Sequence, residues 1–237
     1  KFPAAAEDAM KAWNYLMYLG YGARDVIVAG DSAGGNLALS LTLKLKDEGR
    51  MLPRGLALMS PWTDLTKSGK SYQTRSSVDP VLDQEYLDRM IENYAGGMEL
   101  TNPYISPLFG NLEGLPPVYI QVGDNELLLS DSTQLHKNLV KADVSARIDI
   151  YKGMWHVFQM SPLKNANGNC SRSVRSIAFP FSKLPALSQK AAYAPPAPFV
   201  VLKCALQSRR QASADRCSLS PDHHPASAAP KAVLRLF

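Results

Sequence analysis

Residues 1–163 of this 237-residue chain contain no cysteine. That absence excludes a thiol nucleophile and a zinc–thiolate site from the larger part of the sequence. The three cysteines, Cys170, Cys204 and Cys217, all follow this part and are separated by 34 and 13 residues. Those spacings match neither a metal-binding framework nor a disulfide framework.

Long apolar runs are also missing, and no targeting signal is visible at the N-terminus. No apolar run approaches the roughly 20 residues that a membrane-spanning helix needs. The chain begins Lys1-Phe2-Pro3, without an initiator methionine, a hydrophobic leader or a cleavage site. We therefore expect no membrane span and a cytoplasmic location. The 46% hydrophobic content is enough for one large domain with a sizeable core.

Acidic residues are scarce in the C-terminal third. Residues 1–163 carry 15 Lys/Arg and 19 Asp/Glu, a net charge of −4, whereas residues 164–237 carry 11 and 2, a net charge of +9. This tail holds eight of the 17 prolines and segments such as "SPDHHPASAAPK". We predict a disordered or non-native tail over 164–237. Its scattered charges do not suggest a nucleic-acid partner.

The sequence before the tail alternates between strand-like and helix-like patterns. Short β-branched or apolar runs predict four strands, at Val26–Ala29, Gly55–Met59, Val118–Val122 and Ala146–Tyr151. Helical apolar spacing predicts four helices, at Ala4–Leu19, Leu37–Lys46, Asp83–Tyr94 and Asp131–Lys141. A polar stretch, Thr66–Gly97, interrupts the alternation and is interpreted as an insertion. Strands separated by helices predict an α/β fold with a parallel sheet.

A serine stands between glycines where the first predicted strand meets a helix. The segment is Gly30-Asp31-Ser32-Ala33-Gly34. A sharp strand-to-helix turn exposes a side chain only if its neighbours are small, and the helix then directs its positive end at the site. We interpret Ser32 as the nucleophile of such an elbow, because the motif has the strand and the helix that it requires.

A serine nucleophile needs a general base, and two histidines precede the tail. His136 lies within a helical pattern, which favours an ordinary helix position. His156 follows the strand Ala146–Tyr151, at the edge where sites of parallel sheets assemble. We therefore predict His156 as the base, with a packed loop histidine as the alternative.

The acid that orients the base should lie between Ser32 and His156 in chain order. The segment "VYIQVGDNELLLSD" offers Asp124, Glu126 and Asp131. Asp131 could instead cap the next helix, and Asp124 could be a turn residue. Position alone favours Asp124 or Glu126.

Together these motifs resemble the bacterial hormone-sensitive-lipase-like carboxylesterases, family IV of the α/β-hydrolase fold. The similarity runs from Phe2 to about Gln159. It rests on "FPAAAEDA", the GDSAG motif in "GDSAGGNLA", "SPWTDLT", "DP" at residues 79–80, "NPYISPLFGNLEGLPPVYIQVGDNELLLSDS" and "GMWHVFQ". In that family the acid opens a [DE]-x-L pattern, so the resemblance selects Glu126.

The resemblance also implies a function and a cap. It implies a serine esterase that hydrolyses short-chain, small-molecule esters without a metal or organic cofactor, and it leaves a homodimer of the full-length parent open. The insertion over 66–97 would be part of a cap over the acyl pocket, where Tyr72, Met90 and Tyr94 either line the pocket or pack the helix. A prolyl-oligopeptidase-like peptidase and an inactive scaffold are the alternatives.

The chain departs from the family pattern in two respects. It contains no HGGG segment, whose glycine N–H groups form most of the oxyanion hole in that family, so the N–H of Ala33 is the one donor retained. We therefore expect that Lys1 falls inside the parent protein, that the first strands are missing, and that one side of the sheet is unpaired. The tail replaces the expected last helix.

Overall fold

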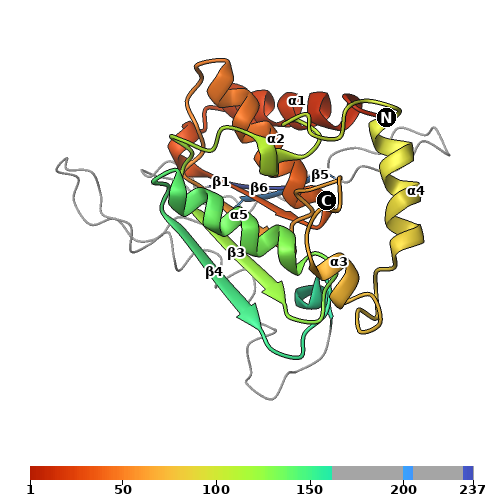
Figure 1. Cartoon of the computed structure of the whole chain (residues 1–237). Helices are drawn as coiled ribbons and strands as arrows, with labels where there is room; N and C mark the ends of the chain where they lie inside the picture. The colour runs from red at the N-terminus through yellow and green to blue at the C-terminus, as the bar shows by residue number, and fades with distance from the viewer. Residues whose placement is uncertain (162–199, 205–231, 237) are drawn as a thin grey trace.

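The computed structural model describes residues 1–161, 200–204 and 232–236, which form a parallel sheet with helices against it (Figure 1). The strands are β1 (Val26–Asp31), β2 (Gly55–Met59), β3 (Val118–Gly123), β4 (Ala146–Tyr151), β5 (Val200–Cys204) and β6 (Ala232–Leu236). Their order is β4-β3-β2-β1-β6-β5, and every pairing is parallel. The predicted α/β fold is confirmed.

Within the described residues, five α-helices precede or connect these strands. They are α1 (Ala4–Tyr18), α2 (Ala33–Asp47), α3 (Ser71–Thr74), α4 (Gln84–Ala95) and α5 (Leu129–Lys141), with 3-10 turns at Ala23–Asp25, Pro107–Phe109 and Phe158–Met160. The four predicted helices are present. Helix α2 begins at Ala33 rather than at Leu37, because the residue after the serine already has helical backbone geometry. The short helix α3 was not predicted, since four residues carry no periodic signal.

The main core lies between one face of the sheet and helices α1, α2 and α5. Alternate residues of the strands, such as Val26 and Val28 on β1, point to this face and are fully buried. The largest buried side chains that meet them come from the helices, including Trp13, Leu16, Leu39, Leu41 and Leu45. Each such side chain stabilises the fold by about 1.5–3 kcal/mol through burial. The core therefore fixes β1 and α2, the elements on either side of Ser32.

The edge of β1 differs from the sequence expectation. We expected this side of the sheet to be unpaired, but β6 pairs with β1 from Val26↔Ala232 to Gly30↔Leu236. Parallel pairing satisfies the backbone groups of β1, and the alternation Leu234, Arg235, Leu236 buries both leucines completely. The expectation of a bare edge is therefore wrong.

Strands β5 and β6 come from the segment predicted as a tail outside the domain. These ten residues form the last two strands of the sheet, so they belong to the domain. The rest of 164–237, including Cys170 and Cys217, lies outside the described residues, and its predicted disorder stays a prediction.

A second apolar cluster, here called the cap cluster, contains residues of the segment predicted as an insertion and residues from outside it. Helices α3 and α4 lie in this segment, and α4 stands to one side of the sheet (Figure 1). The buried members of the cap cluster are Trp62, Leu65, Tyr72, Leu82, Leu87, Ala95, Ile105, Leu127 and Leu128. Leu127 and Leu128 directly follow Glu126 in the loop after β3. The cluster therefore connects the insertion to the loop that carries this predicted acid.

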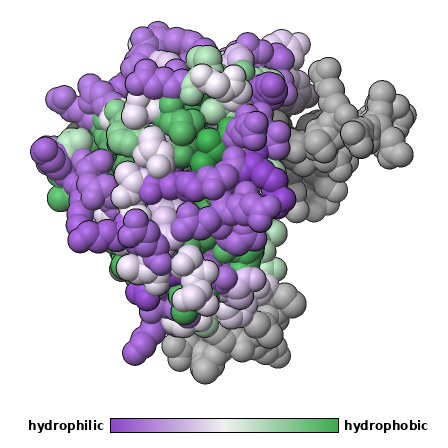
Figure 2. Space-filling view, turned by 45° about the vertical axis from the view of Figure 1, so that its right-hand side comes forward, coloured by the Kyte–Doolittle hydropathy of each residue, from purple (hydrophilic) through white to green (hydrophobic). Residues whose placement is uncertain are grey.

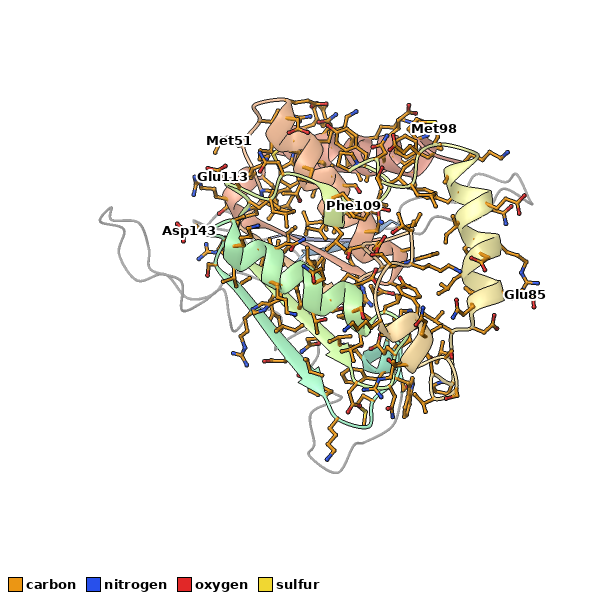
Figure 3. All side chains as sticks on the ribbon, viewed as in Figure 1. Met51, Glu85, Met98, Phe109, Glu113 and Asp143 are labelled. Carbon is orange, nitrogen blue, oxygen red and sulfur yellow. The ribbon has the colours of Figure 1, made fainter. Side chains whose placement is uncertain are left out.

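The surface on the α4 side of the molecule is mostly polar. In Figure 2, which brings the α4 side of the molecule forward, hydrophilic residues cover most of the face, with apolar residues visible between them. Glu85 extends away from the body of the molecule (Figure 3) and forms an exposed ion pair with Arg89. No helix within the described residues is long and apolar enough to cross a bilayer.

Candidate active site

Ser32 lies in the turn between β1 and α2, in a strained backbone conformation. Its φ of 55° and ψ of −121° are outside the regions that non-glycine residues prefer. Backbone hydrogen bonds hold the turn on both sides, from Ser32 N–H to the carbonyl of Met59 at 2.9 Å and from Trp62 N–H to the carbonyl of Ser32 at 3.0 Å. The strain is thus maintained by the neighbouring loop after β2.

Two glycines make this turn sterically feasible. A Cβ on Gly30 would lie 2.1 Å from the carbonyl oxygen of Gly34, and a Cβ on Gly35 would lie 2.7 Å from the Cβ of Pro61. Such contacts are far inside van der Waals distance, so no larger residue fits either position. Gly30 therefore has the steric cause that the sequence suggested, and Gly35, which the motif did not include, has one as well.

His156 contacts both Ser32 and Glu126. The Nε2 atom of His156 lies 2.9 Å from Oγ of Ser32, and its Nδ1 atom lies 3.1 Å from Oε2 of Glu126. His156 is 7% exposed and Glu126 is completely buried, whereas Ser32 is half-buried. A substrate can thus approach the hydroxyl while water is kept from the acid. These three residues have the order of a nucleophile, a base and an orienting acid.

The other two acids that the sequence offered have different partners. Asp124 accepts a hydrogen bond from Gly153 N–H at 2.6 Å, within the turn after β4. Asp131 is buried and accepts the N–H groups of Thr63 and Asp64, each at 2.8 Å. Both acids therefore stabilise loops through hydrogen bonds to backbone N–H groups. Glu126 is the acid that contacts His156.

His136 and Ala33 complete the set of predicted residues. His136 is half-buried on α5, as expected for a helix position. Ala33 is the first residue of α2, so its N–H has no acceptor within the helix and adjoins the nucleophile. The sequence supplies no HGGG segment beside it. The oxyanion role of Ala33 stays a prediction.

Tyr72 packs inside the cap cluster. It is 2% exposed, and its hydroxyl donates to Oδ1 of Asp131 at 2.9 Å. Burial raises the pKa of this tyrosine far above its ordinary value. Of the two interpretations offered for Tyr72, packing is therefore the one that the contacts support. Met90 and Tyr94 are half-buried against the same cluster.

Asp131 makes stability depend on pH. Burial raises the pKa of its carboxyl from 3.8 to about 8, against the opposing effect of the hydrogen bonds from Asp64, Tyr72 and Thr63. Between these two values the folded chain keeps a proton that the unfolded chain has released. The free energy of unfolding should therefore fall by about 1.4 kcal/mol per pH unit as pH rises from about 4 to about 8.

Asp131→Asn tests this dependence. An asparagine cannot titrate, and its amide can still accept the N–H groups of Thr63 and Asp64 while donating to the Tyr72 hydroxyl. Urea unfolding at pH 5, 6, 7 and 8 should give a shallower decline for the variant than for the wild-type chain. Parallel declines in the two proteins would contradict the assignment.

An open surface hollow lies away from the triad. It has a volume of about 860 Å³ and is lined by Gly110, Asn111, Leu112, Glu113, Gly114, Asn138, Lys141, Ala142 and Asp143. In Figure 3, Glu113 and Asp143 lie at the opposite end of the sheet from the arrowheads of β3 and β4. Glu126 and His156 follow those two strands, so this hollow is separate from the candidate site.

Comparison with known proteins identifies the family. The profile of the alpha/beta hydrolase fold matches residues 1–160. The chain belongs to this family. The resemblance to bacterial hormone-sensitive-lipase-like esterases is confirmed by the relatives described next.

An esterase of Acinetobacter venetianus is 39% identical over 160 residues, which cover 67% of this chain and 53% of that esterase. An acetyl-hydrolase of Streptomyces hygroscopicus is 40% identical over 157 residues, covering 66% and 52%. The crystal structure of an esterase from the bacterial hormone-sensitive lipase family matches with a TM-score of 0.72 at 33% identity, covering 77% of this chain and 61% of that one. The chain spans about half the length of the curated relatives it matches.

Proposed function

We propose that this chain carries the catalytic triad of a serine carboxylesterase that hydrolyses short-chain esters. The observation that carries the proposal is the pair of contacts of His156, 2.9 Å to Oγ of Ser32 and 3.1 Å to Oε2 of Glu126. An esterase and an acetyl-hydrolase among the relatives support an ester as substrate and a short acyl group.

The contacts support acyl transfer in two steps. His156 takes the hydroxyl proton of Ser32 as Oγ attacks the ester carbonyl, and Glu126 holds the ring and stabilises its positive charge. The ring then gives the proton to the leaving alcohol, which departs and leaves an acyl-enzyme. Water attacks this ester with His156 again as base, releasing the acid and restoring Ser32. The steps need no cofactor.

Hydrolysis of p-nitrophenyl acetate and of p-nitroacetanilide tests the proposal. Turnover of the ester with little turnover of the anilide is expected, with the Ser32→Ala variant as the blank. Preference for the amide would favour a peptidase. The absence of both activities, together with failure of an organophosphate probe to label Ser32, would favour an inactive scaffold.

The oxyanion hole should limit the rate of this chain. The N–H of Ala33 is the one predicted donor, and loss of a single donor typically costs about 10²–10³ in kcat. A chain extended at its N-terminus by a relative's HGGG-bearing segment should therefore hydrolyse p-nitrophenyl acetate at least about 10²-fold faster. Thermal melts of both proteins control for folding. Equal kcat values in two folded proteins would show that the oxyanion hole is misassigned.

Two partner predictions remain open to experiment. A homodimer of the full-length parent is left open, and no nucleic-acid partner is expected. Sedimentation of the parent protein, and a salt-dependent gel shift for this chain, would test them.

A further inference from the structure

Ser60, the residue directly after β2, contacts two parts of the catalytic site. Its hydroxyl donates to Oε1 of Glu126 at 2.8 Å and accepts a hydrogen bond from the N–H of Val157 at 3.1 Å. Val157 is the residue after His156. Ser60 is completely buried. One hydroxyl therefore joins the acid on the loop after β3 to the histidine loop after β4.

The partners fix the direction of the hydroxyl proton. The N–H of Val157 can only donate, so it occupies a lone pair of the Ser60 oxygen and leaves the Ser60 proton for the Glu126 carboxylate. Oε1 of Glu126 also accepts the N–H of Gly123 at 2.5 Å. Because Oε1 accepts two hydrogen bonds, Oε2 is the oxygen directed at His156.

Ser60 and Val157 both have strained backbone conformations. Ser60 has a φ of 48° and Val157 a φ of 50°, both in the left-handed region, where a β-branched valine is especially unfavourable. Such conformations are unfavourable and persist where the surroundings over-determine them. The Ser60 backbone is held by its N–H, which donates to the carbonyl of Gln121 at 2.7 Å. The Ser60–Val157 hydrogen bond thus links two strained residues.

We infer that Ser60 is a positioning residue for the catalytic triad. It orients the Glu126 carboxylate and fixes the backbone next to His156, so that Nε2 is directed at Ser32. It acts through Glu126 and His156. The inference rests on the proposed esterase function, since it concerns the same triad.

Ser60→Gly isolates the contribution of the hydroxyl. Glycine accepts a φ of 48° without strain, so the variant removes the hydrogen bonds and leaves the turn feasible. A hydrogen bond to a charged group is stronger than one between neutral groups. We therefore expect kcat for p-nitrophenyl acetate to fall by about 10- to 100-fold, with KM changed by less than about twofold, because Ser60 is not expected to bind substrate.

Ser40→Ala is the matched control. Ser40 is 2% exposed, and its hydroxyl lies 3.2 Å from both Oδ1 of Asn36 and the carbonyl of Tyr104, away from the triad. The control also loses a buried hydroxyl, so it reports the effect of a general loss of packing and hydrogen bonding. Its kcat should stay within about twofold of the wild-type value. A fall in kcat as large as that of Ser60→Gly would overturn the inference.

A double-mutant cycle separates positioning from general structure. If Ser60 acts through the acid, Ser60→Gly should lower kcat/KM by less than about threefold in the Glu126→Ala background. An equal fold-change in both backgrounds would show that the two residues act independently, which would overturn the claim that Ser60 acts through Glu126.

A spectroscopic measurement keeps the inference testable if the esterase proposal fails. The Nδ1–H proton of His156 should be slow to exchange in ¹⁵N-histidine spectra of the wild-type chain and of Ser40→Ala, because it donates to buried Glu126. It should exchange at least about tenfold faster in Ser60→Gly. Unchanged exchange would overturn the positioning role, whereas absent ester turnover with this exchange pattern would reject the esterase proposal alone.

Discussion

Ser32→Ala should lower kcat for p-nitrophenyl acetate by about 10⁶-fold, because loss of a serine nucleophile removes the acyl-enzyme route and leaves residual catalysis by binding. The hydroxyl contacts Nε2 of His156 at 2.9 Å. The Ala variant keeps the small side chain that the turn needs, so the melting temperature should change little. Initial rates corrected for uncatalysed hydrolysis measure the effect.

Ser40→Ala is again a suitable control, since Ser40 lies about two turns into α2, the helix that follows Ser32. It should retain wild-type turnover. A Ser32→Ala variant that kept more than about a tenth of wild-type kcat would show that another group attacks the ester.

Glu126→Gln should lower kcat by about 10³- to 10⁴-fold. An amide in place of the carboxylate can present an N–H to Nδ1 of His156, which favours the wrong tautomer and removes the charge that stabilises the imidazolium. The shape of the side chain is preserved, so folding should survive. Stopped-flow or steady-state rates with p-nitrophenyl acetate, and a thermal melt, measure both effects.

Asp124→Asn is the matched control for the acid, because Asp124 lies two residues away and fastens the Gly153 turn. Its kcat should change by less than about threefold. If Asp124→Asn were the damaging change and Glu126→Gln the mild one, the two roles would have to be exchanged.

The nucleophile turn could be predicted from sequence because its requirements are local. Gly30 and Ser32 lie within one sharp turn, and the strand and helix that flank it have clear apolar patterns. The acid could not be chosen by spacing alone. Asp124, Glu126 and Asp131 all follow β3, and chain order does not say which side chain reaches a ring 30 residues later. The family resemblance was needed to favour Glu126.

Contacts between residues far apart in the chain left no local sequence pattern from which they could be predicted. Ser60 stands before a proline at the end of a strand, where a serine is an ordinary turn residue, and its acid partner is 66 residues away. Strand β6 pairs with β1 across more than 200 residues of sequence, and a five-residue strand is too short for its pattern to stand out among proline-rich sequence. Both features depend on tertiary structure.

The most direct test of the central claim is the reaction of the wild-type chain with a fluorophosphonate probe, followed by mass analysis of its peptides. Our account predicts one covalent adduct, on the peptide that carries Ser32, because His156 activates that hydroxyl. The labelling rate should fall at least about 10²-fold in a folded His156→Gln variant. Labelling of another residue, or labelling of Ser32 at the same rate without His156, would contradict the proposed triad.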